Sequence, residues 1–175
     1  MKSNRSSRVG LAIIGSTGAI GGKHLDAIAQ LDSCELIGVH ARRAEPLKSQ
    51  ADSLGVRSYQ TLSEVFGDSD VDAVVIATPH PSHRDIALKA FEASRHVLVE
   101  KPMAVTPSEA DDMIEGARAS RMHLGVLFNN RFRPEALKMH DLINKGVVGK
   151  IYRATMNSAM FRSQAYYDRL DWRGT

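Results

Sequence analysis

Two short polar segments carry the residues best suited to chemistry. The first is Thr78-Pro79-His80-Pro81-Ser82-His83, and the second is Glu100-Lys101-Pro102. Each follows an apolar run typical of a buried strand, so both are expected at the carboxyl edge of a sheet, where ligands bind in open α/β folds. A lysine at such an edge can accept or donate the proton of a substrate hydroxyl. Taken alone, Lys101 is better explained as an exposed lysine that forms a salt bridge with its neighbour.

A third segment, Gly15-Ser-Thr-Gly18-Ala-Ile-Gly21, separates an apolar run from a helical pattern. Glycines at this point allow a tight turn and bring backbone N–H groups close to a pyrophosphate at the helix N-terminus. The spacing is G-x-x-G-x-x-G, so an ordinary glycine-rich turn is the alternative interpretation. The predicted cofactor contacts in this segment are Gly15, Thr17, Gly18, Ala19 and Ile20.

The segment His40-Ala41-Arg42-Arg43 follows the second predicted strand. In NAD-binding domains an acidic residue near this point accepts hydrogen bonds from the adenosine ribose. Ala41 occupies the expected carboxylate position, and Arg42 and Arg43 offer forked donors that suit a 2′-phosphate. The pattern favours NADP(H), with NAD(H) possible. A solvated basic pair at a strand end is the alternative.

Apolar runs alternate regularly with amphipathic stretches along most of the chain. The predicted strands are Val9–Ile14, Glu35–His40, Arg57–Tyr59, Ala73–Ala77, His96–Val99 and His123–Phe128. The predicted helices are Ile20–Gln30, Ala44–Leu54, Leu62–Phe66, His83–Glu92, one that begins at Thr106-Pro107 with a capping box to Glu109, and one from Pro134 to near Gly146. Strict alternation predicts an α/β fold, a doubly wound parallel sheet of the Rossmann type with strand order 3-2-1-4-5-6.

The predicted domain organisation has three parts. Residues 1–7 are expected to form a disordered tail, and residues 8–149 the dinucleotide-binding Rossmann domain. Alternation of side-chain character over Ile151–Phe161 predicts a long strand, so we expect residues 150–175 to begin a truncated α/β second domain. A single strand cannot form a sheet alone.

Composition excludes several classes of partner. Of the 175 residues, 43% are hydrophobic and 25% charged, the net charge is +3, and the longest basic run is Arg42-Arg43, which argues against nucleic acid and anionic membranes. No apolar stretch is long enough to cross a bilayer. The single cysteine, Cys34, favours a reducing cytoplasm. The histidines, His24 among them, lack metal-ligand spacing, so no metal site is predicted.

Several of these segments together resemble one enzyme family. Asp72–Pro79 with His83, His96–Val105, Phe128–Pro134 and Gly146–Gly149 are similar to the pattern of the glucose–fructose oxidoreductase/inositol dehydrogenase (Gfo/Idh/MocA) family. The resemblance extends from about Val9 to Thr175. It is carried most specifically by the Glu-Lys-Pro element after the fifth predicted strand.

The resemblance implies roles for individual residues. Glu100 would bond the nicotinamide ribose, and Lys101 would touch the substrate oxygen as the catalytic residue. The remaining contacts that we expect near the cofactor are Thr78, Pro79, His80, His83, Asn129, Arg131, Trp172 and Arg173. Loop capping is the alternative for Asn129 and Arg131.

These observations predict an NAD(P)-dependent oxidoreductase that transfers hydride between a nicotinamide and a hydroxyl or keto group of a sugar, cyclitol or related polyol. The family normally continues into a second domain that holds a histidine acid/base, and full-length members form homo-oligomers. We therefore expect the chain as given to be incomplete for catalysis. The alternative is a non-catalytic dinucleotide-binding module, or a fragment without its catalytic domain.

Overall fold

A computed structural model describes residues 8–168 of the chain. The chain divides into two compact units, Met1–Asn129 and Asn130–Thr175, which are considered separately below. The predicted tail at residues 1–7 lies outside the described residues.

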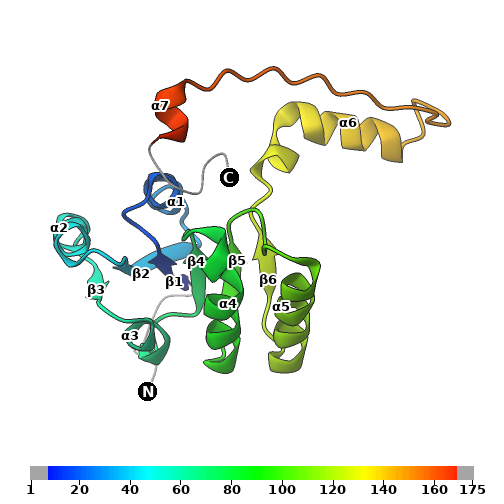
Figure 1. Cartoon of the computed structure of the whole chain (residues 1–175). Coiled ribbons are helices and arrows are strands. Elements are labelled where there is room, and N and C mark those ends of the chain that lie inside the picture. The colour runs from blue at the N-terminus through cyan, green and yellow to red at the C-terminus, as the bar shows by residue number, and fades with distance from the viewer. Residues whose placement is uncertain (1–7, 169–175) are drawn as a thin grey trace. The chain divides into compact units, whose positions relative to one another are not determined.

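The first unit is built on one six-stranded sheet (Figure 1). The strands are β1 (Val9–Ile14), β2 (Cys34–His40), β3 (Arg57–Tyr59), β4 (Ala73–Ile76), β5 (His96–Val99) and β6 (Leu124–Val126). Their spatial order is β3-β2-β1-β4-β5-β6, and every pair is parallel. This order confirms the predicted doubly wound Rossmann topology.

Helices connect the strands at nearly the predicted positions. In the first unit they are α1 (Ala19–Ile28), α2 (Ala44–Leu54), α3 (Leu62–Gly67), α4 (His83–Glu92) and α5 (Pro107–Ser120), with a short 3-10 helix η1 (His80–Ser82) before α4. The predicted capping box of α5 is confirmed, because the Thr106 hydroxyl accepts from the N–H of Glu109 and the Glu109 side chain accepts from the N–H of Thr106. Among residues 8–168, no helix is long and apolar enough to span a membrane.

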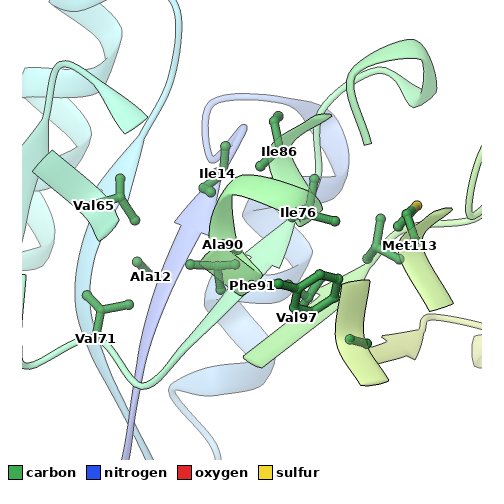
Figure 2. Close-up of a cluster of buried hydrophobic side chains, with 14 of the residues drawn as sticks. Ala12, Ile14, Val65, Val71, Ile76, Ile86, Ala90, Phe91, Val97 and Met113 are labelled. Atoms are coloured by element: carbon green, nitrogen blue, oxygen red, sulfur yellow. The ribbon is translucent and has the colours of Figure 1, made fainter. Parts of the chain in front are cut away.

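Alternate strand residues pack on opposite faces of the sheet. Ile14 of β1 and Ile76 of β4 lie in one buried cluster with Phe91 of α4 (Figure 2). Ile13, the neighbour of Ile14 in sequence, packs on the other face with Ile28 of α1. Because both faces are covered, these strands are apolar at nearly every position, as the sequence predicted.

The second unit contains η2 (Asn129–Phe132, at its boundary), α6 (Pro134–Asn144) and α7 (Gln164–Tyr167). The strand predicted over Ile151–Phe161 is not formed, since residues 150–163 carry neither helix nor strand. Tyr152, Met156 and Phe161 are almost fully exposed there. A strand is stabilised by pairing its backbone groups with a neighbour, and this unit forms no strand within its described residues.

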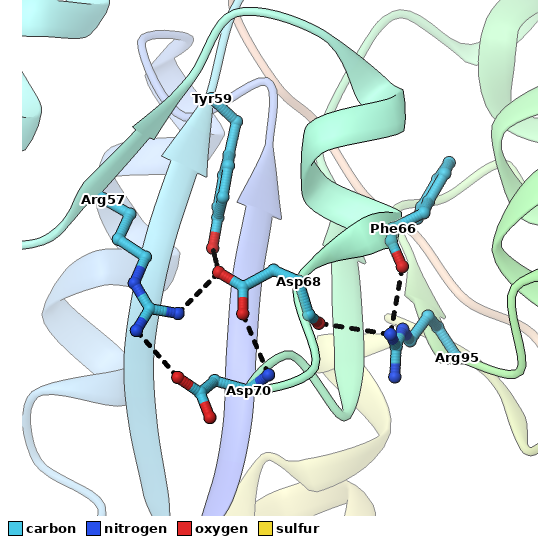
Figure 3. Close-up of polar contacts among 6 residues, drawn as sticks. All are labelled: Arg57, Tyr59, Phe66, Asp68, Asp70 and Arg95. Atoms are coloured by element: carbon cyan, nitrogen blue, oxygen red, sulfur yellow. Dashed lines mark hydrogen bonds and ion pairs between the residues drawn. The ribbon is translucent and has the colours of Figure 1, made fainter. Parts of the chain in front are cut away.

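A polar network joins β3 to the segment before β4 (Figure 3). Asp68 accepts hydrogen bonds from the Tyr59 hydroxyl at 2.7 Å and from Arg57 at 2.5 Å, and Arg57 also donates to Asp70 at 2.7 Å. Arg95 donates to the Asp68 carbonyl oxygen at 3.1 Å. The network therefore ties the amino-terminal edge of the sheet together, away from the ligand edge.

Asp68→Asn is expected to lower the free energy of unfolding at pH 7 by about 1–2 kcal/mol, because a charged acceptor of several bonds is lost. Burial acts to raise the pKa of Asp68, but the hydrogen bonds from Tyr59, the Asp70 N–H and Arg57 outweigh it and hold the pKa below its ordinary value. A carboxyl with a lowered folded-state pKa stabilises the fold above its unfolded pKa of about 4 and loses that contribution as pH falls through the folded value. The deficit of the variant should therefore shrink in acid.

Urea unfolding at several pH values measures this difference. Asp85→Asn is the matched control, because Asp85 is exposed and paired only across the surface with Arg84, so its loss should cost less than about 0.5 kcal/mol. An Asp68→Asn protein as stable as the parent at pH 7 would contradict the prediction.

Candidate functional site

Three loops meet at the carboxyl edge of the sheet. They follow β1, β4 and β5, which are adjacent and parallel. The loops begin as continuations of the strand pairing: the N–H of Ala77 donates to the Ile14 carbonyl at 2.8 Å, and that of Glu100 donates to the Ile76 carbonyl at 2.9 Å. The edge therefore gathers the glycine loop, the Thr78–His83 segment and the Glu100–Pro102 segment, as the sequence predicted.

Two positions of the glycine loop, Gly15 and Gly21, have no room for a side chain. Gly15 has φ +93° and donates its N–H to the His40 carbonyl at 2.8 Å. A Cβ on Gly15 would lie 2.7 Å from the Ala77 carbonyl oxygen, and one on Gly21 would lie 2.4 Å from the Ser16 carbonyl oxygen. Both clashes are with backbone, which a rotamer change cannot relieve.

The amino end of α1 is open to a ligand. Its N-cap, Gly18, offers no side-chain hydrogen bond, and the first turn contains no acidic residue. Gly18, Ala19 and Ile20 are exposed, and Thr17 is half-buried. The first N–H groups of a helix lack intrahelical partners and attract anions. The glycine loop and the amino end of α1 therefore fit the pyrophosphate of a dinucleotide.

The end of β2 presents no carboxylate. Ala41 is buried and packs with Leu47 of α2, whereas Arg42 and Arg43 are exposed. Arg43 is the N-cap of α2 and makes no side-chain capping bond. Two exposed guanidinium groups thus follow the end of β2, with one carboxylate, Glu45, in the first turn of α2.

His83 links two of the loops from inside the fold. It is 1% exposed, its Nε2 lies 2.9 Å from the Thr78 carbonyl oxygen, and its Nδ1 lies 3.0 Å from the Pro102 carbonyl oxygen. Each nitrogen can donate to the carbonyl that it faces, one at a time in a neutral ring. Pro79 is exposed and His80 is half-buried in the same loop. Direct cofactor contact by His83 stays a prediction, but its burial gives it a clear part in fixing the two loops.

Glu100 is held from two sides, and Lys101 points outward. Glu100 Oε2 accepts from the Lys101 N–H at 3.1 Å, and its Oε1 lies 3.0 Å from Nε2 of His24. The Lys101 side chain is exposed. The peptide bond between Lys101 and Pro102 is cis.

The role of His24 was missed from the sequence, where only its lack of metal-ligand spacing was interpreted. The contact with Glu100 spans 76 positions, so no local pattern reveals it. The available signal was the position of His24 one helical turn after Gly21, since residues three apart share a helix face.

The remaining predicted contacts lie near or beyond the unit boundary. Asn129 is the last residue of the first unit and is exposed, and Arg131 belongs to the second unit, where it is also exposed. Trp172 and Arg173 lie outside the described residues. Roles for these four residues stay predictions.

A parallel sheet in this order, with a glycine loop opening α1 and side chains gathered at the same edge, defines a dinucleotide-binding Rossmann domain. Comparison with known proteins agrees. The model of the Gfo/Idh/MocA oxidoreductase family, described as an NAD-binding Rossmann fold, matches residues 9–128. The chain belongs to this family.

Several proteins that resemble this chain are dehydrogenases. The 4-carboxy-2-hydroxymuconate-6-semialdehyde dehydrogenase of Sphingobium sp. is 32% identical over 137 residues, which cover 78% of this chain and 43% of that protein. The myo-inositol 2-dehydrogenase of Thermotoga maritima is 28% identical over 144 residues, which cover 82% and 42%. The structure of the WlbA dehydrogenase from Bordetella pertussis, in complex with NADH and UDP-GlcNAcA, has a TM-score of 0.90 and 32% identity, and the match covers 97% of this chain and 49% of that one. The chain thus spans about half the length of these proteins.

Proposed function

We propose that this protein is an NAD(P)-dependent oxidoreductase that transfers hydride between a nicotinamide and a hydroxyl or keto group of a sugar, cyclitol or related polyol. The observation that carries the proposal is the placement of Glu100 and Lys101 at the same sheet edge as the open amino end of α1. A dinucleotide with its pyrophosphate on α1 would extend its other half along this edge, as in doubly wound folds generally.

The side chains at this edge would have different roles. The bound nicotinamide supplies the hydride acceptor or donor. The Glu100 carboxylate can accept hydrogen bonds from a ribose hydroxyl, which orients the ring. Lys101 is exposed beside it. Its side chain can hydrogen-bond to the substrate oxygen and accept or donate the proton of that oxygen during hydride transfer. Thr78 and Pro79 form the neighbouring wall of the site.

The substrate class rests on the relatives. A myo-inositol dehydrogenase and an enzyme solved with UDP-GlcNAcA both resemble this chain, so cyclitols and sugar derivatives are the first compounds to test. We further propose a reducing cytoplasm as the compartment, on the strength of the single cysteine, and a homo-oligomer for the full-length protein.

The proposed cofactor preference is NADP(H) over NAD(H). Ala41 removes the carboxylate that would repel a 2′-phosphate, and Arg42 and Arg43 outnumber Glu45 beside it. Fluorescence titration with NADPH and NADH at one salt concentration should give tighter binding of NADPH. Arg42→Ala should weaken NADPH binding roughly tenfold and NADH binding little, within the range for charge-assisted bonds. Equal affinities for the two cofactors, or tighter binding of NADH, would contradict the preference and would not bear on the fold.

A turnover screen of the full-length protein with inositols, aldoses and UDP-sugars then separates the proposed enzyme from a non-catalytic dinucleotide-binding module. Both bind the cofactor, but only the enzyme changes nicotinamide absorbance with a substrate present. A chain that binds neither NADPH nor NADH would overturn the proposed function.

A further inference from the structure

The contact between His24 and Glu100 joins the helix of the phosphate loop to the loop of the proposed nicotinamide site. His24 lies in α1, and its Nε2 is 3.0 Å from Glu100 Oε1, with each side chain 17% exposed. A carboxylate can only accept, so the imidazole donates through a protonated Nε2. The other Glu100 oxygen accepts from the Lys101 N–H. Both oxygens are therefore engaged by the protein itself.

We propose that His24 is a positioning residue that holds the Glu100 carboxylate in the orientation needed to bind the nicotinamide ribose. This inference rests on the proposed function. α1 would then contribute to binding both halves of the cofactor. Its amino end would bind the pyrophosphate, and His24 in its next turn would orient the Glu100 carboxylate that binds the nicotinamide ribose.

The physical argument concerns rotamer freedom. A glutamate on a loop samples several rotamers, and fixing one of them on binding lowers affinity. The helix limits the motion of His24, and the bond to Nε2 selects one arrangement of Glu100 before any ligand arrives. Removing this bond should weaken binding of the nicotinamide half about five- to tenfold, the size expected for one hydrogen bond, and leave the pyrophosphate half unaffected.

The test compares His24→Phe, which keeps a ring but removes the donor, with His24→Gln, whose amide N–H can replace Nε2. Each variant of the full 175-residue chain is titrated with ADP, which carries only the adenosine and pyrophosphate portion, and with whichever of NADH and NADPH the parent binds more tightly. His24→Phe should lose about five- to tenfold in affinity for the dinucleotide and less than about twofold for ADP. His24→Gln should restore most of the dinucleotide affinity.

A double variant completes the design. Adding His24→Phe to Glu100→Ala should cause no further loss of dinucleotide affinity, because the histidine would act only through Glu100. Unchanged dinucleotide binding in His24→Phe, an equal loss for ADP, or additive losses in the double variant would each overturn the inference. If the parent chain binds neither ADP nor the dinucleotide, the proposed function on which the inference rests is overturned instead.

Discussion

Gly21→Ala is expected to reduce dinucleotide affinity by about 100-fold and the free energy of unfolding by about 1–3 kcal/mol. The added Cβ would lie 2.4 Å from the Ser16 carbonyl oxygen and 2.6 Å from that of Gly15, so the loop backbone has to move away from α1. The N–H groups that face the pyrophosphate would move with it. Loss of two charge-assisted bonds, at about 1.5 kcal/mol or more each, accounts for the drop in affinity.

Gly22→Ala is the matched control for this substitution. Gly22 is the next residue of the same helix, and a Cβ there meets nothing within 4 Å. Alanine is the better helix former, so this variant should be about 0.5–1 kcal/mol more stable than the parent and should bind the cofactor equally well. Urea unfolding and fluorescence titration measure both quantities. If the two variants behave alike, the close packing between α1 and the loop does not control binding.

His83→Ala is expected to lower the free energy of unfolding by about 2–4 kcal/mol and to weaken dinucleotide binding as well. The ring is 1% exposed, so its removal leaves a cavity. It also removes the ring nitrogens that face the Thr78 and Pro102 carbonyl oxygens, and the loss of a hydrogen bond costs about 0.5–1.5 kcal/mol. Because these carbonyls belong to two loops of the site, both loops should become less ordered.

His80→Ala controls for the loss of a nearby imidazole. His80 is half-buried and its ring centroid lies 6.4 Å from that of His83. Its removal should cost less than about 1 kcal/mol of stability. Thermal unfolding of the two variants, with amide hydrogen exchange at the two loops, tests the difference. Equal stability in the two variants would show that His83 does not hold the loops together.

The fold was predictable because its determinants are local and repeated. Apolar strands such as Val9–Ile14 and the capping box at Thr106 and Glu109 each give a strong signal over a few residues, and strict alternation leaves few topologies. The strand predicted over Ile151–Phe161 was wrong for the opposite reason. A strand depends on a neighbour to pair with, and side-chain alternation cannot supply one.

The site was predictable in its loops and less so in its internal contacts. Gly15, Thr78, Glu100 and Lys101 follow strand ends, so parallel topology alone places them at one edge. The bonds that hold these loops depend on distances across the fold, and the link from His24 to Glu100 spans 76 positions. The preference for NADP(H) stays a prediction, which rests on the residue types of Ala41, Arg42 and Arg43.

The central position of β1 has a consequence for how the protein folds. This strand pairs with β2 on one side and with β4 on the other, and Gly10 bonds the Asp72 side chain 62 positions away. Gly15 likewise contacts the ends of both neighbours, at His40 and Ala77. During synthesis β1 is made before β4 and is enclosed only once β4 has paired with it, and such long-range pairing is slow. The cofactor loop is therefore synthesised before β4 and reaches its native shape only after β4 has paired with β1.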